Sequence, residues 1–99
     1  MIEFRNTEAI QAGISIKELR ERNKLSRSEF AVKARLTPEY LKCLEEGRED
    51  KISEEIIERI LIAGRVCKRG KKYTSEELKN TLLSIKAAIP PEEQLFELE

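Results

Sequence analysis

The sequence predicts an all-α fold built from five helices. Apolar residues recur at the three- and four-residue spacing of helices along most of the chain, and only 5% of the residues are aromatic. Hydroxyl residues stand where helix N-caps are expected, and three of them have a glutamate three positions later, which is the pattern of a capping box. The expected N-caps are Ser15, Ser26, Thr37, Ser53 and Thr74.

The expected helices follow from these starts. They cover Ile16–Asn23, Arg27–Ala34, Pro38–Glu46, Glu54–Cys67 and Ser75–Ala88. Gly47 and Gly70 are the expected left-handed ends of the third and fourth helices, and the prolines at positions 90 and 91 prevent the fifth from continuing. Thr7–Gly13 can add one short helical turn. The β-capable stretches Ile2–Phe4 and Leu95–Leu98 can pair with each other or across a dimer, but they are expected to fray.

The composition excludes several classes of function. A chain of 99 residues without histidine and with two cysteines cannot form the usual four-ligand zinc sites or use a histidine general base. We therefore expect no enzyme, no metal and no cofactor. No apolar run approaches the length of a membrane span, and no signal-peptide pattern is present. This predicts a cytoplasmic protein with reduced thiols and no membrane contact.

Charge is strongly zoned although 19 basic and 19 acidic residues cancel. Residues 15–36 carry seven basic and three acidic side chains, whereas residues 37–58 carry three basic and eight acidic ones. This zoning favours oriented docking onto an anion or head-to-tail association, with most single charges simply solvated. A cationic cluster after the fourth helix can hold phosphates, bind RNA or face solvent. Its members are Arg65, Lys68, Arg69, Lys71 and Lys72.

Residues 26–47 read SRSEFAVKARLTPEYLKCLEEG, two capped helices joined by a three- to four-residue turn. Spacing alone leaves an ordinary helical hairpin as an alternative. The stretch Ile16–Ala63 resembles the helix-turn-helix domain of the phage repressor and Cro (Xre-like) family. The matching residues are Arg20, Ser26, Ala31, Leu36, Glu45 and Gly47. The resemblance implies a five-helix lambda-repressor-like helix-turn-helix domain with an extra C-terminal helix, and a structural ion pair between Arg20 and Glu45.

The resemblance also implies double-stranded DNA as the partner, with Pro38–Glu46 as the recognition helix in the major groove. The residues expected to read bases are Thr37, Pro38, Glu39, Tyr40, Lys42 and Cys43. Glu39 can only accept hydrogen bonds when ionised, so it is expected to choose a cytosine amino group. The start of the second helix offers free N–H groups to phosphates. The residues expected to bind phosphates are Ser26, Arg27, Ser28, Lys17, Lys24, Arg48 and Lys51.

Two features depart from the family pattern. The family usually has glycine in the turn where this chain has Arg35, and a non-glycine residue held left-handed costs roughly 1 to 2 kcal/mol, so we expect a remodelled turn. Acidic residues also crowd the recognition helix and its exit, which predicts tight sequence discrimination, modest affinity or a partner other than DNA. They are Glu39, Glu45, Glu46, Glu49 and Asp50.

The chain is expected to divide into an N-terminal extension (1–14), a helix-turn-helix DNA-binding domain (15–67) and a segment with a basic linker, C-terminal helix and acidic tail (68–99). The C-terminal helix carries an apolar stripe, which we expect a second copy to cover rather than the protein's own domain. The stripe consists of Leu78, Leu82, Leu83, Ile85 and Ile89. The predicted function is a sequence-specific DNA-binding transcriptional regulator, a homodimeric repressor acting on an operator. The alternative is an antitoxin or adaptor that binds a toxin or co-regulator through the C-terminal helix and tail.

Overall fold

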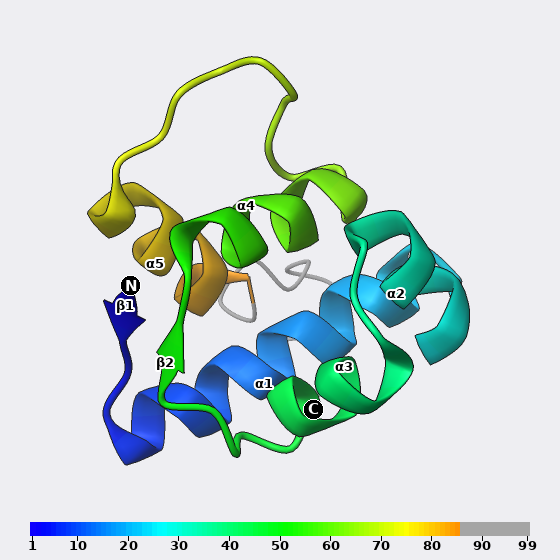
Figure 1. Ribbon diagram of the computed structural model, residues 1–99, viewed down its shortest axis with the longest axis horizontal. Helices are drawn as coiled ribbons and strands as arrows, with labels where there is room; N and C mark the ends of the chain where they lie inside the picture. Colours follow the sequence, from blue (N-terminus) through cyan, green and yellow to red (C-terminus); the bar gives the residue numbers. More distant parts are fainter. Residues whose placement is uncertain (86–99) are drawn as a thin grey trace, which may run out of the picture.

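The structure, a computed structural model, describes residues 1–85, in which five helices surround one core and two short strands lie at one side (Figure 1). The elements are β1 (Ile2–Glu3), α1 (Asn6–Arg22), α2 (Arg27–Ala34), α3 (Pro38–Glu45), β2 (Lys51–Ile52), α4 (Glu54–Ala63) and α5 (Ser75–Ser84). The expected helical class is confirmed. The end of the expected fifth helix, Ile89 of its stripe and the stretch Leu95–Leu98 lie outside the described residues.

Four of the five helices begin where their hydroxyl caps predict. Ser26, Thr37, Ser53 and Thr74 are N-caps, and each side-chain oxygen accepts the backbone N–H three residues later. These bonds satisfy N–H groups that have no partner inside the helix. As a result α2 occupies the expected residues, and α3 ends one residue earlier than expected, at Glu45.

The expected start of the first helix is wrong. α1 begins at Asn6 instead of Ile16, and Ser15 is a fully buried residue within the helix rather than its cap. The residues before it belong to the same buried helical face, which removes more apolar surface from water than a cap could offset. That face consists of Ala9, Ala12, Ile16 and Leu19.

The expected end of the fourth helix is also wrong. α4 stops at Ala63, four residues before Cys67, because the backbone then turns left-handed at Arg65 (φ 65°). The N–H groups of Val66 and Cys67 both donate to the carbonyl of Leu61, at 2.9 and 3.2 Å, which closes the helix end. Gly70 has a positive φ of 87° but lies in the following loop, whereas Gly47 (φ 75°) follows α3 as expected.

The N-terminal residues are part of the domain, so neither the expected fraying nor the expected extension over residues 1–14 is correct. β1 pairs antiparallel with β2, and the pair Ile2 and Ile52 is buried on one face of this ribbon. The N–H of Phe4 donates to the carbonyl of Asp50 at 2.7 Å, and the Phe4 ring is buried. Burial of the Ile2 and Phe4 side chains holds the N-terminal strand in place.

The stripe of α5 faces the protein's own core. α1 packs against α3 and α5, and α4 packs against α2 and α5. Leu78, Leu82 and Ile85 are 1%, 0% and 4% exposed, and Leu83 packs against the same core. The expectation that a second copy covers these four residues is therefore wrong, because α1 and α4 already cover them.

Candidate nucleic-acid interface

The start of α2 is ordered by a complete capping box. The Ser26 hydroxyl accepts the N–H of Glu29 at 3.1 Å, and the N–H of Ser26 donates to a Glu29 carboxylate oxygen at 2.8 Å. That backbone bond also lowers the pKa of Glu29. The N–H groups of Arg27 and Ser28 remain at the positive end of the helix, where no intrahelical carbonyl can reach them. This end presents backbone donors to solvent in a fixed direction, as anion binding requires.

The turn between α2 and α3 keeps a left-handed residue without glycine. Arg35 has φ 59° and ψ 44°, its N–H donates to Val32 at 3.2 Å, and the N–H of Leu36 donates to Ala31 at 2.8 Å. The expected remodelling of this turn is wrong. Ala31 is fully buried where the two helices cross, and its packing compensates for the strained turn.

α3 presents most of the expected base-reading residues outward. Leu41 and Leu44 are buried, while Thr37, Pro38, Glu39 and Lys42 are exposed and Cys43 is half-buried. Tyr40 differs from the others. It packs against the core, and burial, with a smaller contribution from Glu49, raises the pKa of its hydroxyl. The structure therefore places Tyr40 as a packing residue behind the exposed start of α3.

The far end of α3 is clamped by Glu45. The Arg20 Nε and Nη2 atoms donate to the two carboxylate oxygens of Glu45 at 2.8 and 3.1 Å, and the Glu45 side chain is only 2% exposed. Arg20 also donates to the Leu25 carbonyl at 3.2 Å, and its hydrogen bonds to the Glu45 carboxylate raise the pKa of Arg20. Arg27 reaches the same carboxylate through Nη2 at 3.2 Å. The two arginines thus tie α1, α2 and α3 together at one buried anion.

Gly13, which the sequence analysis did not single out, sets the distance between α1 and α3. A Cβ atom on Gly13 would lie 2.5 Å from the Leu44 carbonyl oxygen and 2.6 Å from that of Glu45. Both atoms belong to the backbone of α3 and cannot swing aside. The two helices can therefore approach this closely only because glycine has no side chain.

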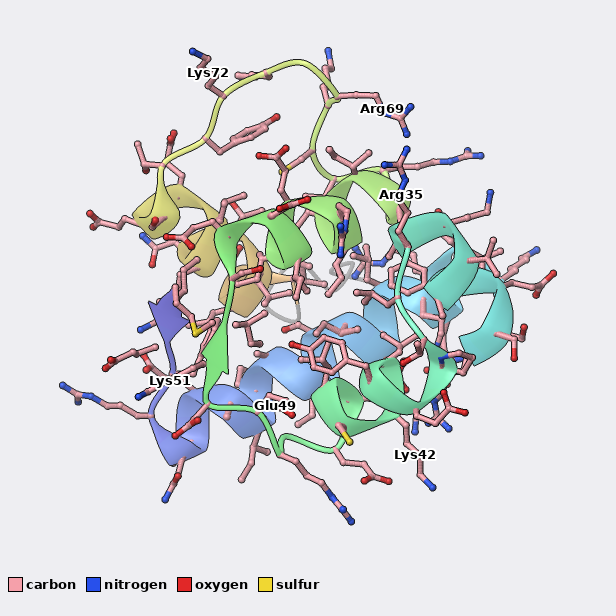
Figure 2. All side chains as sticks on the ribbon, viewed as in Figure 1. Arg35, Lys42, Glu49, Lys51, Arg69 and Lys72 are labelled. Carbon is pink, nitrogen blue, oxygen red and sulfur yellow. The ribbon has the colours of Figure 1, made fainter. Side chains whose placement is uncertain are left out.

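The expected phosphate-binding cations do not form one cluster. Arg27 pairs with Glu45, and Arg48 pairs with Glu46 at 2.9 Å. Lys17 is exposed on α1. Figure 2 shows Lys51 on β2, at the other end of the molecule from Lys42 on α3. Lys24 lies with Arg65 in a surface hollow at the ends of α1 and α4. Of the expected phosphate-binding residues, those that lie beside the ion pairs of Glu45 at the end of α3 are therefore Ser26, Arg27 and Ser28.

The structure gathers positive charge where α1, α2 and α4 end. We call this set the basic face; it consists of Arg22, Lys24, Lys33, Arg35, Arg65 and Arg69. Lys24 was expected to bind phosphate, and Arg65 and Arg69 belong to the cationic cluster after the fourth helix, whereas Arg22, Lys33 and Arg35 were given no role in binding. The gathering itself depends on stretches far apart in the sequence.

Residues 1–85 contain no group of three or more cysteine, aspartate or glutamate side chains placed to hold a metal ion. None of the helices within those residues is long and apolar enough to cross a membrane.

Comparisons with known proteins agree with this geometry. The sequence model of the family described as "Helix-turn-helix domain" matches residues 11–66, more than half of the chain. A crystal structure of the clp gene regulator ClgR from Corynebacterium glutamicum is similar in fold, with a TM-score of 0.61 and 19% identity over 92% of this chain and 85% of that one. A second ClgR structure from the same organism gives a TM-score of 0.60 and 19% identity over 84% and 94% of the two chains. No curated protein matches the sequence. On the family match, this chain belongs to the helix-turn-helix domain family.

Proposed function

We propose that the protein is a sequence-specific DNA-binding transcriptional regulator that uses α3 as its recognition helix. The observation that carries the proposal is the exposed start of α3, held at its other end by the buried Glu45 carboxylate. In helix-turn-helix proteins the second helix of the motif enters the major groove with its N-terminal residues toward the bases. A helix fixed at its far end presents its first turn with little loss of entropy on binding.

Base reading is assigned to the exposed residues of α3. Glu39 lies in the first turn and accepts hydrogen bonds only, so it suits the amino group of a cytosine. Lys42 follows on the exposed side and suits the acceptors of a guanine. Pro38 offers only apolar contact, for which a thymine methyl is the natural partner. Thr37 and Cys43 flank this set, while Tyr40 supports it from behind.

Phosphate contact is assigned to the start of α2. The N–H groups of Arg27 and Ser28 sit at the positive end of the helix dipole, and the Arg27 side chain, which is 39% exposed, lies between Glu45 and solvent. Three acidic residues that follow α3 repel a nearby phosphate backbone of DNA. They are Glu46, Glu49 and Asp50. The proposed complex therefore has low affinity for random DNA and depends on base contacts for its stability.

Repression by occupancy of an operator, with two copies on adjacent half-sites, belongs to the same proposal. Helix-turn-helix proteins commonly pair two subunits so that their recognition helices reach successive turns of the duplex. The buried residues of the α5 stripe are unavailable for that pairing, and likewise for the toxin or co-regulator of the alternative function. Sedimentation of the free protein and of the DNA complex measures the number of copies.

Selection of duplexes from a random pool tests the function directly. The selected duplex should shift the protein in a gel at about 50 mM salt, where release of counterions favours binding most. A variant with Glu39→Ala and Lys42→Ala should keep the helical circular dichroism spectrum and lose the preference for the selected sequence. Failure of the pool to converge would contradict the proposal.

A further inference from the structure

The basic face contains three adjoining surface hollows of about 340, 340 and 270 Å³. Lys33 lines all three, so the hollows form one continuous trough. Arg65 lines the first two, and no acidic residue contributes to either of them. The third hollow also contains Glu55, Glu58 and Arg59, and Arg59 pairs with Glu55 at 3.3 Å. Positive charge is therefore densest around Lys33 and Arg65.

The positive charge on this face exceeds the negative charge of the helix C-termini that lie there. Three helices end here, and each C-terminus carries about half a negative charge, roughly 1.5 charges in all. The six cations of the basic face outweigh this even when Glu58 of the third hollow is added, since Glu55 is paired with Arg59. Within residues 1–85 none of the six takes part in an ion pair, whereas Arg27 and Arg48 beside α3 are both paired. Within residues 1–85, more unpaired positive charge thus lies on the basic face than beside α3.

Three of the cations occupy positions where glycine is the easier residue. Lys24, Arg35 and Arg65 have φ values of 57°, 59° and 65°, and they are the non-glycine residues with positive φ in the described chain. All three side chains line the hollows. Each of the three ends a helix, where the N–H of the next residue donates to the carbonyl five residues before it, so the left-handed backbone places three cations at three adjoining helix ends. The Asn23 side chain donates to the carbonyls of Leu19 and Gly64 at 2.8 and 3.2 Å, which joins the ends of α1 and α4 and fixes this arrangement.

The basic face lies away from the recognition helix. Figure 2 shows Arg35 and Arg69 at the α2–α4 side of the molecule, and Lys42 on α3 and Glu49 in the segment after α3 at the opposite side. A straight duplex bound to α3 cannot reach both sides of a domain whose smallest dimensions are 28 and 27 Å. Arg35, two residues before Thr37, borders both surfaces, whereas Lys33, Arg65 and Arg69 line hollows at the ends of α2 and α4 and leave the basic face available to a second ligand.

We propose that the basic face is a second, sequence-independent binding surface for the phosphate backbone of double-stranded DNA. Successive hollows lined by lysine and arginine suit the regular spacing of phosphates along a strand. The trough lacks the large apolar anchor that a protein partner needs, since its apolar lining is limited to Leu25, Ile62 and Ala63. Together with the proposed role of α3, on which this last step rests, one molecule then holds two duplex segments.

A pair of charge-reversal variants tests the proposal. The first carries Lys33→Glu and Arg65→Glu in the trough. The matched control carries Arg5→Glu and Lys72→Glu, which change net charge equally at exposed residues that line none of the three hollows. Circular dichroism melting verifies folding, and Lys33→Gln with Arg65→Gln replaces the first variant if it does not fold. The probe is a fluorescent 30-base-pair duplex of random sequence.

The trough variant should bind this duplex at least tenfold more weakly, with a salt dependence reduced by about two ion equivalents, whereas the control should change less than about threefold. The wild-type protein should also capture the fluorescent duplex on an immobilised one, and the trough variant should not. Equal weakening in both variants would overturn the proposal, because only net charge would then matter. So would a change in the sedimentation of the DNA-free trough variant, which would indicate an acidic protein surface as the occupant.

The same measurements separate this inference from the proposed function. If random-pool selection fails but the trough variant alone loses random-duplex binding, the proposed role of α3 fails and the basic face stands. If the selected duplex binds normally and reversal of the trough changes nothing, the basic face fails and the role of α3 stands.

Discussion

Arg20 on α1 and Glu45 at the end of α3 form a two-point ion pair, Nε to Oε2 at 2.8 Å and Nη2 to Oε1 at 3.1 Å, within a nearly closed site. Removal of one partner strands a buried charge, whereas removal of both leaves an apolar contact. The pair therefore governs how firmly α3 is held.

Arg20→Leu should lower the free energy of unfolding by about 3 kcal/mol, because Glu45 keeps only its contact with Arg27. Urea denaturation measures this change. The double variant Arg20→Leu with Glu45→Leu should recover at least half of the loss. A single variant that loses less than about 1 kcal/mol would show that the pair does not hold α3.

Gly13→Ala should destabilise the protein by about 1 to 2 kcal/mol, although alanine is the better helix former. The added Cβ would meet the carbonyl oxygens of Leu44 and Glu45 and push α3 away from α1. Asn80→Ala, at an exposed position of α5, is the control and should be neutral or slightly stabilising. Thermal melting of both variants gives the comparison, and equal melting temperatures would rule out a close contact at Gly13.

Glu39→Ala should relax preference at one base pair of the selected sequence by about 1 to 3 kcal/mol, as expected for loss of one base contact. Arg27→Ala should instead weaken all sequences alike, because it removes a phosphate contact. Competition binding with single-base variants of the duplex measures both effects. A uniform loss for Glu39→Ala would remove this residue from base reading.

Acid should weaken the attachment of α4 to α5 through Glu54. A hydrogen bond from the Ser75 hydroxyl at 2.7 Å and a contact with the N-terminal ammonium at 3.0 Å lower the pKa of Glu54 to about 2, from an ordinary value of 4.5. Because the folded pKa is the lower one, the stabilisation is complete above pH 4.5 and is lost as pH falls toward 2. Glu54→Gln should flatten the stability profile in this window, and Glu55→Gln on the next residue should leave its shape unchanged. Urea midpoints between pH 2 and 6 measure the slope.

Local signals predicted the helices whose starts depend on a few neighbouring residues. The bounds of α2 and the start of α3 follow from Ser26, Thr37 and Pro38, which act within one turn. The same kind of signal failed at Ser15 because burial of a longer helical face outweighed it. The spacing of Ala9, Ala12, Ile16 and Leu19 was the sign that α1 starts earlier.

Features that depend on contacts between distant segments could not be predicted from the sequence. The pairing of Ile2 with Ile52, the α1–α3 contact at Gly13 and the burial of Leu82 all depend on the packing of remote elements. The basic face is of the same kind, since it exists only where the ends of α1, α2 and α4 converge. Arg35 also shows that tertiary packing retains a turn that local propensity disfavours.

At the three cationic residues with a left-handed backbone, stability favours glycine whereas positive charge requires lysine or arginine. Laboratory evolution for heat resistance alone would be drawn to glycine at Lys24, Arg35 and Arg65, since each replacement relieves backbone strain of roughly 1 kcal/mol. Each such gain would delete one positive charge from the same side of the molecule. A variant stabilised in this way would therefore bind polyanions more weakly. The order in which the glycine substitutions appear would show whether selection favours stability or positive charge.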